Sequence, residues 1–302
     1  MRAFGRLQCK RCLSAEVKFD VYQRTYVIRS LNTDRLLNRF LYYALRPKLD
    51  LLQSISTGAA TKFLTLTLLN DLEIDFPEIA TQKRIVGLLS AYDEMTENNK
   101  RRIEILEQTA QVLYKEWFLN FRFPGCETVK LVPSPAGDIP QGWENIRLDT
   151  HFETVLGGTP SRRRAEFWEG GTIPWINSGK INELRVLEAS EFITPAGLKM
   201  SSTKLMPKRT TVIAITGATL GQVSLTELEV CANQSVVGIY DISQVGSEYL
   251  YLTFKTIIQA VIQLASGGAQ QHINKDIVNA THIVAAPSRS FGRIQTLGTS
   301  SV

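Results

Sequence analysis

Three consecutive arginines in the second half of the chain could bind nucleic acid. Arg162, Arg163 and Arg164 follow residues 157–160, which read Gly-Gly-Thr-Pro. A basic loop after such a turn can reach DNA phosphates or the edge of a guanine, because a guanidinium group donates paired hydrogen bonds to either. An exposed run of charge that only solubilises the protein fits the same residues. We therefore take these arginines as candidates for DNA contact.

A second candidate loop lies near the end of the chain. Gln270, Gln271 and His272 follow Gly267 and Gly268. A glutamine amide can pair with both hydrogen-bonding groups of an adenine edge, and backbone amides exposed by glycine can hold phosphate. A purely structural turn explains the glycines equally well. Weaker polar candidates of the same kind are Asn177, Ser178, Lys180, Lys204 and Thr219.

The sequence carries no motif of catalysis. His151, His272 and His282 lack the spacing of metal ligands, and neither a G-x-S-x-G elbow nor the Asn-Pro-Pro-Tyr/Phe motif of adenine methyltransferases occurs. Residues 216–221, T-G-A-T-L-G, lack the Gly-Lys-Ser/Thr ending of a phosphate loop, so we expect a tight hairpin there. The chemistry expected of this chain is binding, without catalytic residues or metal ligands.

Composition favours a folded protein of the cytoplasm. The 302 residues are 44% hydrophobic and 21% charged, which is enough for one large core or two ordinary ones. No stretch approaches the roughly 18 apolar residues of a membrane span, and the N-terminus has no signal-peptide pattern. The C-K-R-C pair at Cys9 and Cys12 lacks the second ligand pair that zinc needs. The net charge of +5 permits DNA as a partner without requiring it.

A long internal repeat indicates two related domains. Residues 56–77 align without gaps with residues 266–287, at an offset of 210. Upstream, FLYYAL from Phe40 resembles YLYLTF from Tyr249 at an offset of 209. This period is far too long for a solenoid, so the repeat indicates two copies of a whole domain. The first copy matches only the C-terminal part of the second.

Residues 81–121, between the two copies, have the pattern of one long helix. The segment has no proline and one glycine, Gly87. Apolar residues recur in steps of four and three, which is typical of a coiled coil, and the length favours that reading over an amphipathic helix lying on a globular core. Two polar residues interrupt the pattern, as register-fixing residues do. We call the following set the seam: Ile85, Leu89, Tyr92, Thr96, Asn99, Ile103, Leu106, Ala110, Leu113 and Trp117.

The last part of the chain has the pattern of a mixed domain. From Trp143 onward, short β-rich runs alternate with turns, and a helical stretch begins at Glu248. We therefore expect an α+β fold, in which mixed α/β domains are joined by a long coiled-coil helix.

Motifs spread over nearly the whole chain resemble those of one family. The long helix opens with P-x-x-x-T-Q-K-R-I-V-x-x-L at 77–89. Further motifs are I-P-x-G-W at 139–143, G-G-T-P-S-R at 157–162, I-P-W-I-N-S-G at 173–179, T-G-A-T-L-G at 216–221 and S-G-G-A-Q-Q at 266–271. In this order and spacing they resemble the specificity subunits of type I restriction-modification systems.

The resemblance implies a DNA-binding subunit without an active site. Members of that family carry two target-recognition domains, each followed by a conserved helix, and the two helices pack antiparallel as a spacer. Each domain reads one half of a split site in double-stranded DNA. Modification (methyltransferase) subunits bind S-adenosylmethionine and methylate adenine, and restriction (translocase and nuclease) subunits use ATP and Mg. No cofactor is therefore expected in this chain, and no membrane.

The same resemblance divides the chain into five parts. We expect the C-terminal part of a first recognition domain at 1–77, the spacer helix at 78–124, a linker at 125–142, a second recognition domain at 143–287 and an atypical tail at 288–302. No second spacer helix follows residue 287, so the seam lacks an antiparallel partner within the chain. We expect either a fragment of a longer gene product or a half-subunit that associates with a second specificity chain. The alternative is a coiled-coil adaptor, or a degenerate fragment, without specific DNA binding.

Overall fold

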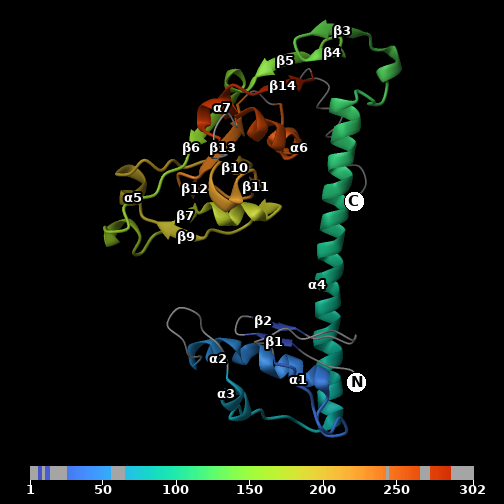
Figure 1. Ribbon diagram of the computed structural model, residues 1–302, viewed down its shortest axis with the longest axis vertical. Coiled ribbons are helices and arrows are strands. Elements are labelled where there is room, and N and C mark those ends of the chain that lie inside the picture. Colours follow the sequence, from blue (N-terminus) through green and yellow to red (C-terminus); the bar gives the residue numbers. More distant parts are fainter. Residues whose placement is uncertain are drawn as a thin grey trace. The chain divides into compact units, whose positions relative to one another are not determined.

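The computed structural model separates into two compact units (Figure 1). Unit 1 is Met1–Ile105 and unit 2 is Leu106–Val302. The described residues are 6–8, 11–13, 26–55, 65–242, 245–265 and 273–286. The candidate loop with Gln270, Gln271 and His272, the residue Cys9 and the tail at 288–302 lie outside them, so the predictions for these residues remain predictions.

The described part of unit 1 is mostly helical. A hairpin of β1 (Arg6–Gln8) and β2 (Arg11–Leu13) precedes the helices. These are α1 (Asn38–Leu45), the 3-10 turn η1 (Arg46–Lys48), α2 (Leu49–Ile55), α3 (Leu66–Asn70) and the first part of α4 (Ile79–Tyr114). Leu52 is fully buried against Tyr26, Ile28, Leu49 and Leu69. Burying one such leucine stabilises the fold by about 1.5–3 kcal/mol.

A buried glutamine ties the start of α4 to the rest of unit 1. Gln82 is fully buried. Its Oε1 accepts a hydrogen bond from the backbone N–H of Leu37 at 2.9 Å, and its Nε2 donates to the carbonyl oxygens of Arg35 at 2.8 Å and Pro77 at 2.7 Å. A buried amide is costly unless its groups are paired, so the surrounding backbone demands this residue type. The T-Q-K-R motif therefore has a structural role.

The predicted long helix is confirmed by α4. It runs for 36 residues and continues as a π-helical turn, η2 (Lys115–Leu119). At 1.5 Å per residue, α4 alone is roughly 54 Å long. The helical segment ends just before Phe121, which has a left-handed φ of 55°. Within the seam, the Thr96 hydroxyl donates to the carbonyl oxygen of Tyr92 at 2.8 Å, so its polar group is satisfied by its own helix.

Unit 2 confirms the predicted mixed domain. Its five-stranded sheet has the order β6-β13-β10-β11-β8, with β8 parallel to β11 and the other neighbours antiparallel. A three-stranded sheet, β12-β7-β9, and the two-stranded pairs β14-β5 and β3-β4 complete the strands. The strands of the two larger sheets are β6 (Phe152–Leu156), β7 (Ile173–Ile176), β8 (Arg185–Val186), β9 (Glu191–Ile193), β10 (Thr211–Ala214), β11 (Val223–Thr226), β12 (Cys231–Ala232) and β13 (Val236–Asp241).

Shorter strands, three α-helices and several 3-10 turns make up the rest of the part of unit 2 that the structure describes. The remaining strands are β3 (Leu131–Ser134), β4 (Gly137–Pro140), β5 (Glu144–Arg147) and β14 (His282–Ala285). The α-helices are α5 (Pro195–Lys199), α6 (Ser247–Ala265) and α7 (Lys275–Asn279). The 3-10 turns are η3 (Cys126–Thr128), η4 (Leu148–Thr150), η5 (Ala165–Phe167), η6 (Ser178–Asn182) and η7 (Gly217–Thr219).

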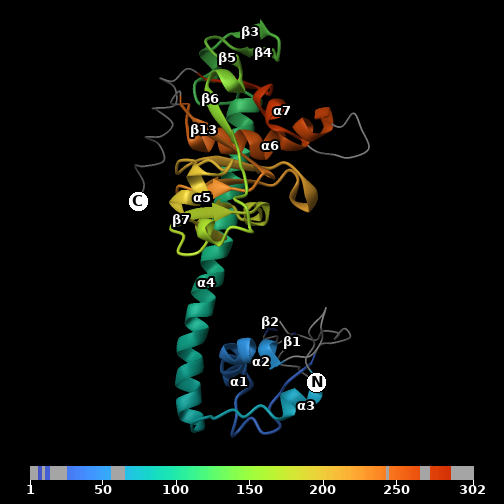
Figure 2. The same ribbon diagram turned by 90° about the vertical axis from the view of Figure 1, so that its left-hand side faces the viewer.

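The five-stranded sheet has an apolar core on each face, and its central strands β10 and β13 are apolar at consecutive positions. Ile213 of β10 packs in one core with Phe254 of α6, whereas its neighbours Val212 and Ala214 pack in a second core with Ile176 of β7. Alternate residues of a strand point to opposite faces, so such runs require a cover on each side. Both views show α6 and the β7 layer on opposite sides of the sheet (Figures 1 and 2).

The structure supports the internal repeat and corrects its register. α3 in unit 1 and α7 in unit 2 begin 209 residues apart and have the same length. Their N-caps are equivalent: the Thr65 side chain accepts from the N–H of Leu68 at 3.4 Å, and the Asn274 side chain accepts from that of Ile277 at 2.9 Å. The offset within these helices is thus 209 and not 210. Across the described ranges, no helix is long and apolar enough to span a membrane.

Candidate nucleic-acid interface

The first arginine of the candidate loop is held within unit 2. Arg162 donates two hydrogen bonds to the carboxylate of Glu191, at 2.5 and 2.7 Å. Its guanidinium carbon lies 3.5 Å from the ring centroid of Trp168 and 5.2 Å from that of Trp175. The paired guanidinium holds the pKa of Glu191 below its ordinary value. A planar guanidinium that is both stacked and doubly hydrogen-bonded is fixed in position, so Arg162 braces the loop.

The other two arginines differ from each other. Arg164 pairs with Glu166, its Nε donating at 2.9 Å, and its guanidinium carbon lies 4.2 Å from the ring centroid of Phe167. Arg163 is exposed and, in the part of the chain that the structure describes, has no hydrogen-bond or ion-pair partner. The run that looked uniform in sequence therefore consists of two bracing residues around one free cation.

The glycines before this loop allow two backbones to cross closely. A Cβ on Gly157 would lie 2.1 Å from the carbonyl oxygen of Asn233, and one on Gly158 would lie 2.6 Å from the nitrogen of Thr203. The carbonyl oxygen of Gly158 accepts a hydrogen bond from the indole N–H of Trp175 at 3.1 Å. No larger residue fits this crossing. The crossing places Thr203, which directly precedes Lys204, beside the start of the arginine loop.

The remaining sequence candidates fall into two classes. Lys180 donates to Glu183 at 2.9 Å and Glu188 at 2.8 Å, and the Asn177 side chain caps η6 by accepting from the N–H of Gly179. These two residues are thus engaged within unit 2. Lys204 is exposed, and neither it nor Ser178 has a side-chain partner among the described residues. Thr219 lies in η7, which packs beside η6, and donates weakly to the carbonyl oxygen of Thr216 at 3.5 Å.

The predicted hairpin at 216–221 is confirmed. β10 and β11 pair antiparallel on either side of it. Gly217 and Gly221 have positive φ angles of 72° and 80°, which side-chain-bearing residues rarely adopt. A Cβ on Gly221 would also lie 2.7 Å from Cδ1 of Ile262 on α6. The motif therefore specifies a turn that packs against α6.

The described residues give little support for nucleophilic or metal chemistry. Burial raises the pKa of the Cys231 thiol to about 11, which keeps it protonated at neutral pH. Within the described ranges, no group of three His, Cys, Asp or Glu residues is placed to hold a metal ion.

The seam of α4 is exposed along most of its length. The side chains of Tyr92, Ile103 and Leu106 are 62%, 52% and 67% exposed. At the C-terminal end, Leu113 and Trp117 line an apolar cavity of about 330 Å³ next to Tyr249 on α6. Isolated exposed apolar residues are ordinary, whereas a row of them along one helix face is typical of an interaction surface.

Known proteins resemble this chain in sequence and fold. The family model described as "Type I restriction modification DNA specificity domain" matches residues 12–108 and 140–286. The MjaIX specificity subunit of Methanocaldococcus jannaschii is 24% identical over 270 residues, covering 87% of this chain and 62% of that protein. The EcoR124I/EcoR124II specificity subunit of Escherichia coli is 32% identical over 182 residues, covering 59% of this chain and 41% of that protein.

A solved structure shares the fold. The S subunit of a type I restriction-modification system from M. genitalium superposes with a TM-score of 0.57 at 16% identity, covering 98% of this chain and 76% of that one. Among the curated relatives, the chain spans 62% of the length of both the MjaIX subunit and the HindI subunit of Haemophilus influenzae.

Proposed function

Because this chain belongs to the family of type I restriction-modification DNA specificity domains, we propose that it is the DNA-recognition subunit of such a system. Unit 2 reads one half of a bipartite site in double-stranded DNA, and α4 joins it to the other components. The observation that carries the proposal is the family match over residues 12–108, which include most of the 36-residue helix α4, and over residues 140–286. The chain contributes recognition, and catalysis belongs to its partners.

Arg163 and Lys204, whose side chains have no partner among the described residues, are the best candidates for DNA contact in unit 2. Arg163 projects from a loop that Arg162 and Arg164 brace, and Lys204 follows the segment packed against Gly158. A braced loop loses little conformational freedom on binding, so its free arginine can be aimed at a phosphate or a guanine edge. Residues already paired within unit 2, such as Lys180, shape the surface.

The exposed seam is the surface for assembly. A second amphipathic helix packs on this seam, and it belongs to a further specificity segment or to a second specificity chain. Modification and restriction subunits dock around the two helices. Thr96 and Asn99 sit in the middle of the seam, where polar residues select one register. S-adenosylmethionine, ATP and Mg bind to those partner subunits, and the assembly acts on cytoplasmic DNA.

Methylation mapping of the host genome tests the function. Deleting the gene should remove adenine methylation from one bipartite motif and leave other motifs unchanged. A methylome identical with and without the gene would contradict the proposal. A gel shift with co-purified modification subunit distinguishes this function from that of a coiled-coil adaptor. A complex built on an adaptor would bind random duplexes without sequence preference. Methylation by the purified chain alone would point instead to an enzyme.

Arg163→Ala should weaken DNA binding by the assembled complex about tenfold, and lower the salt dependence of the binding constant by about one phosphate contact. The physical reason is the loss of an unpaired cation at the proposed interface. Arg101→Ala on the exposed surface of α4 removes the same charge and is the control. Equal losses of affinity for the two variants, measured by titration at several salt concentrations, would show that Arg163 acts only through net charge.

A further inference from the structure

Unit 2 holds the end of α4 along one face of the helix. Glu107, Tyr114 and Phe118 are seven and four residues apart, so they lie on the same face of a helix with 3.6 residues per turn. Glu107 and Tyr114 are roughly 10 Å apart along the helix axis. Side chains from elsewhere in unit 2 contact all three, and this face adjoins the C-terminal end of the seam, where Leu113 and Trp117 line the same cavity.

The later contact is aromatic. The rings of Tyr114 and Phe118 are stacked at 5.3 Å, and Phe118 meets Tyr249 edge-on at 4.9 Å and Trp143 at 5.6 Å. The hydroxyl of Tyr114 donates to the hydroxyl of Thr253 at 3.0 Å. These contacts attach the end of the helix firmly, but a single cluster at one end leaves the rest of the helix free to pivot.

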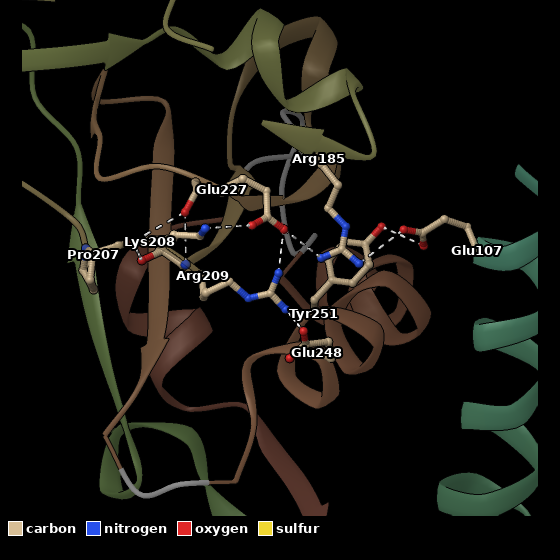
Figure 3. Close-up of polar contacts among 10 residues, drawn as sticks. Glu107, Arg185, Pro207, Lys208, Arg209, Glu227, Glu248 and Tyr251 are labelled. Carbon is tan, nitrogen blue, oxygen red and sulfur yellow. Dashed lines mark hydrogen bonds and ion pairs between the residues drawn. The ribbon is translucent and has the colours of Figure 1, made fainter. Parts of the chain in front are cut away.

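The earlier contact is polar and centres on Glu107 (Figure 3). Its carboxylate accepts a hydrogen bond from the hydroxyl of Tyr251 on α6 at 3.4 Å and pairs with Nη2 of Arg185 on β8 at 3.5 Å. The side chain is only 12% exposed. Burial and the nearby carboxylate raise the pKa of Tyr251 to about 12, so the phenol remains a donor at any ordinary pH. Glu107 is therefore a charged anchor shielded from water.

Arg185 is in turn held by a chain of ion pairs. Its Nη1 lies 3.8 Å from Glu227, which also pairs with Arg209 at 2.5 Å and with Lys208 at 3.7 Å. Arg209 pairs with Glu248 in the first turn of α6. Figure 3 shows Arg185 and Tyr251 reaching Glu107 of α4, while Lys208 and Arg209 meet Glu227 on the other side of Arg185. The sheet, α6 and α4 are thus connected by one network.

We propose that Glu107 is a positioning residue, which with Arg185 and Tyr251 forms a second attachment that fixes the angle between α4 and the recognition domain. Two attachments on one helix face define a direction, whereas one allows pivoting. The consequence for DNA rests on the proposed function: a domain held at one angle accepts one gap between half-sites. The network thereby helps to set the spacing of the target.

Distance measurement on the DNA-free full chain tests the attachment itself. Nitroxide amino acids at Glu97 on α4 and Lys199 on α5, both exposed, report the angle while the native cysteines remain. Glu107→Gln should broaden the distance distribution about twofold, because the polar attachment is lost while the aromatic one remains. The control Glu104→Gln removes a charge from an exposed position of the same helix and should leave the distribution unchanged.

A second variant tests whether a broader distance distribution reflects the lost attachment or a folding defect. Tyr251→Phe keeps the buried ring and removes only the hydroxyl, so it should broaden the distribution to a smaller extent. In the wild type, about 1 M NaCl should change the distribution little, because ion pairs shielded from water are screened much less than exposed pairs. Unchanged distributions in Glu107→Gln and Tyr251→Phe would overturn the proposal.

The DNA consequence is measured separately by methylation mapping in cells that carry the complete system. Glu107→Gln should keep the half-site bases and raise methylation of sites with a gap one base pair longer or shorter by about tenfold relative to wild type, since contacts within one network couple by such factors. If Glu107→Gln methylates only sites with the wild-type gap between half-sites, this consequence is wrong. Absence of any bipartite motif in the wild type would refute the proposed function, while the distance measurement would still decide the attachment.

Discussion

Phe118→Ala should lower the free energy of unfolding of unit 2 by about 3–5 kcal/mol, the usual cost of removing a buried phenylalanine ring. The Phe118 side chain is 9% exposed and packs against Tyr114, Tyr249 and Trp143. Truncation leaves a cavity at the junction of η2, the linker and α6, where the surrounding rings belong to separate segments and cannot all collapse inward. The helix end then loses its main attachment.

Tryptophan fluorescence during chemical denaturation measures this loss. The four tryptophans of the chain all belong to unit 2, so the signal reports that unit alone. Leu119→Ala is the matched control, because the neighbouring side chain is 45% exposed and should cost less than about 1 kcal/mol. Similar losses for the two variants would mean that the aromatic cluster contributes no special stability to the junction.

Gly157→Ala should destabilise unit 2 by about 2–3 kcal/mol, although it adds a single methyl group, because overpacking of a close contact forces the backbone to move. The added Cβ would lie 2.1 Å from the carbonyl oxygen of Asn233 and 2.6 Å from that of Ala232. These are backbone atoms of a short paired segment, which cannot rotate away as a flexible side chain could. DNA binding should fall as well, since the crossing presents the loop that carries Arg163.

Gly87→Ala makes the same chemical change with the opposite expected sign. Gly87 lies inside α4, and a methyl group added there would have no atom within 4 Å apart from the neighbouring backbone of its own helix. Alanine should stabilise the helix by about 1 kcal/mol, because it restricts the unfolded chain and favours helical backbone angles. Thermal unfolding followed by far-ultraviolet circular dichroism compares the two variants. A neutral Gly157→Ala would show that the crossing can relax without cost.

Local sequence patterns were sufficient to predict the elements. The seven-residue periodicity from Ile85 to Trp117 predicted α4, because a helix needs only a consistent apolar face and no breakers. The glycines of residues 216–221 predicted the hairpin, because few other residues adopt positive φ there. The repeat predicted two copies of one domain, and its register was wrong by one residue at α3 and α7 because an ungapped alignment cannot accommodate a one-residue insertion or deletion.

Those patterns could not predict contacts between side chains that are far apart in sequence. The run at 162–164 looked uniform, and only the fold brings Glu191 onto Arg162 while leaving Arg163 free. Gln82 was part of a motif at the start of the long helix, and only the structure shows that its side chain is buried and bonded to the backbone at Arg35 and Pro77. Each partner lies in a different element, so its position depends on how the chain packs.

The amino-acid sequence was enough to establish the family, the long helix with its apolar seam and the mixed character of the second domain, because motifs, periodicity and turn residues act over short stretches of chain. The packed structure was needed to show which arginine is free, why Gly157 and Gly158 are glycines and how Glu107 joins α4 to Arg185 and Tyr251. Charges and hydrogen bonds act over a few ångströms in space, and the residues that share them here are up to 144 positions apart in sequence.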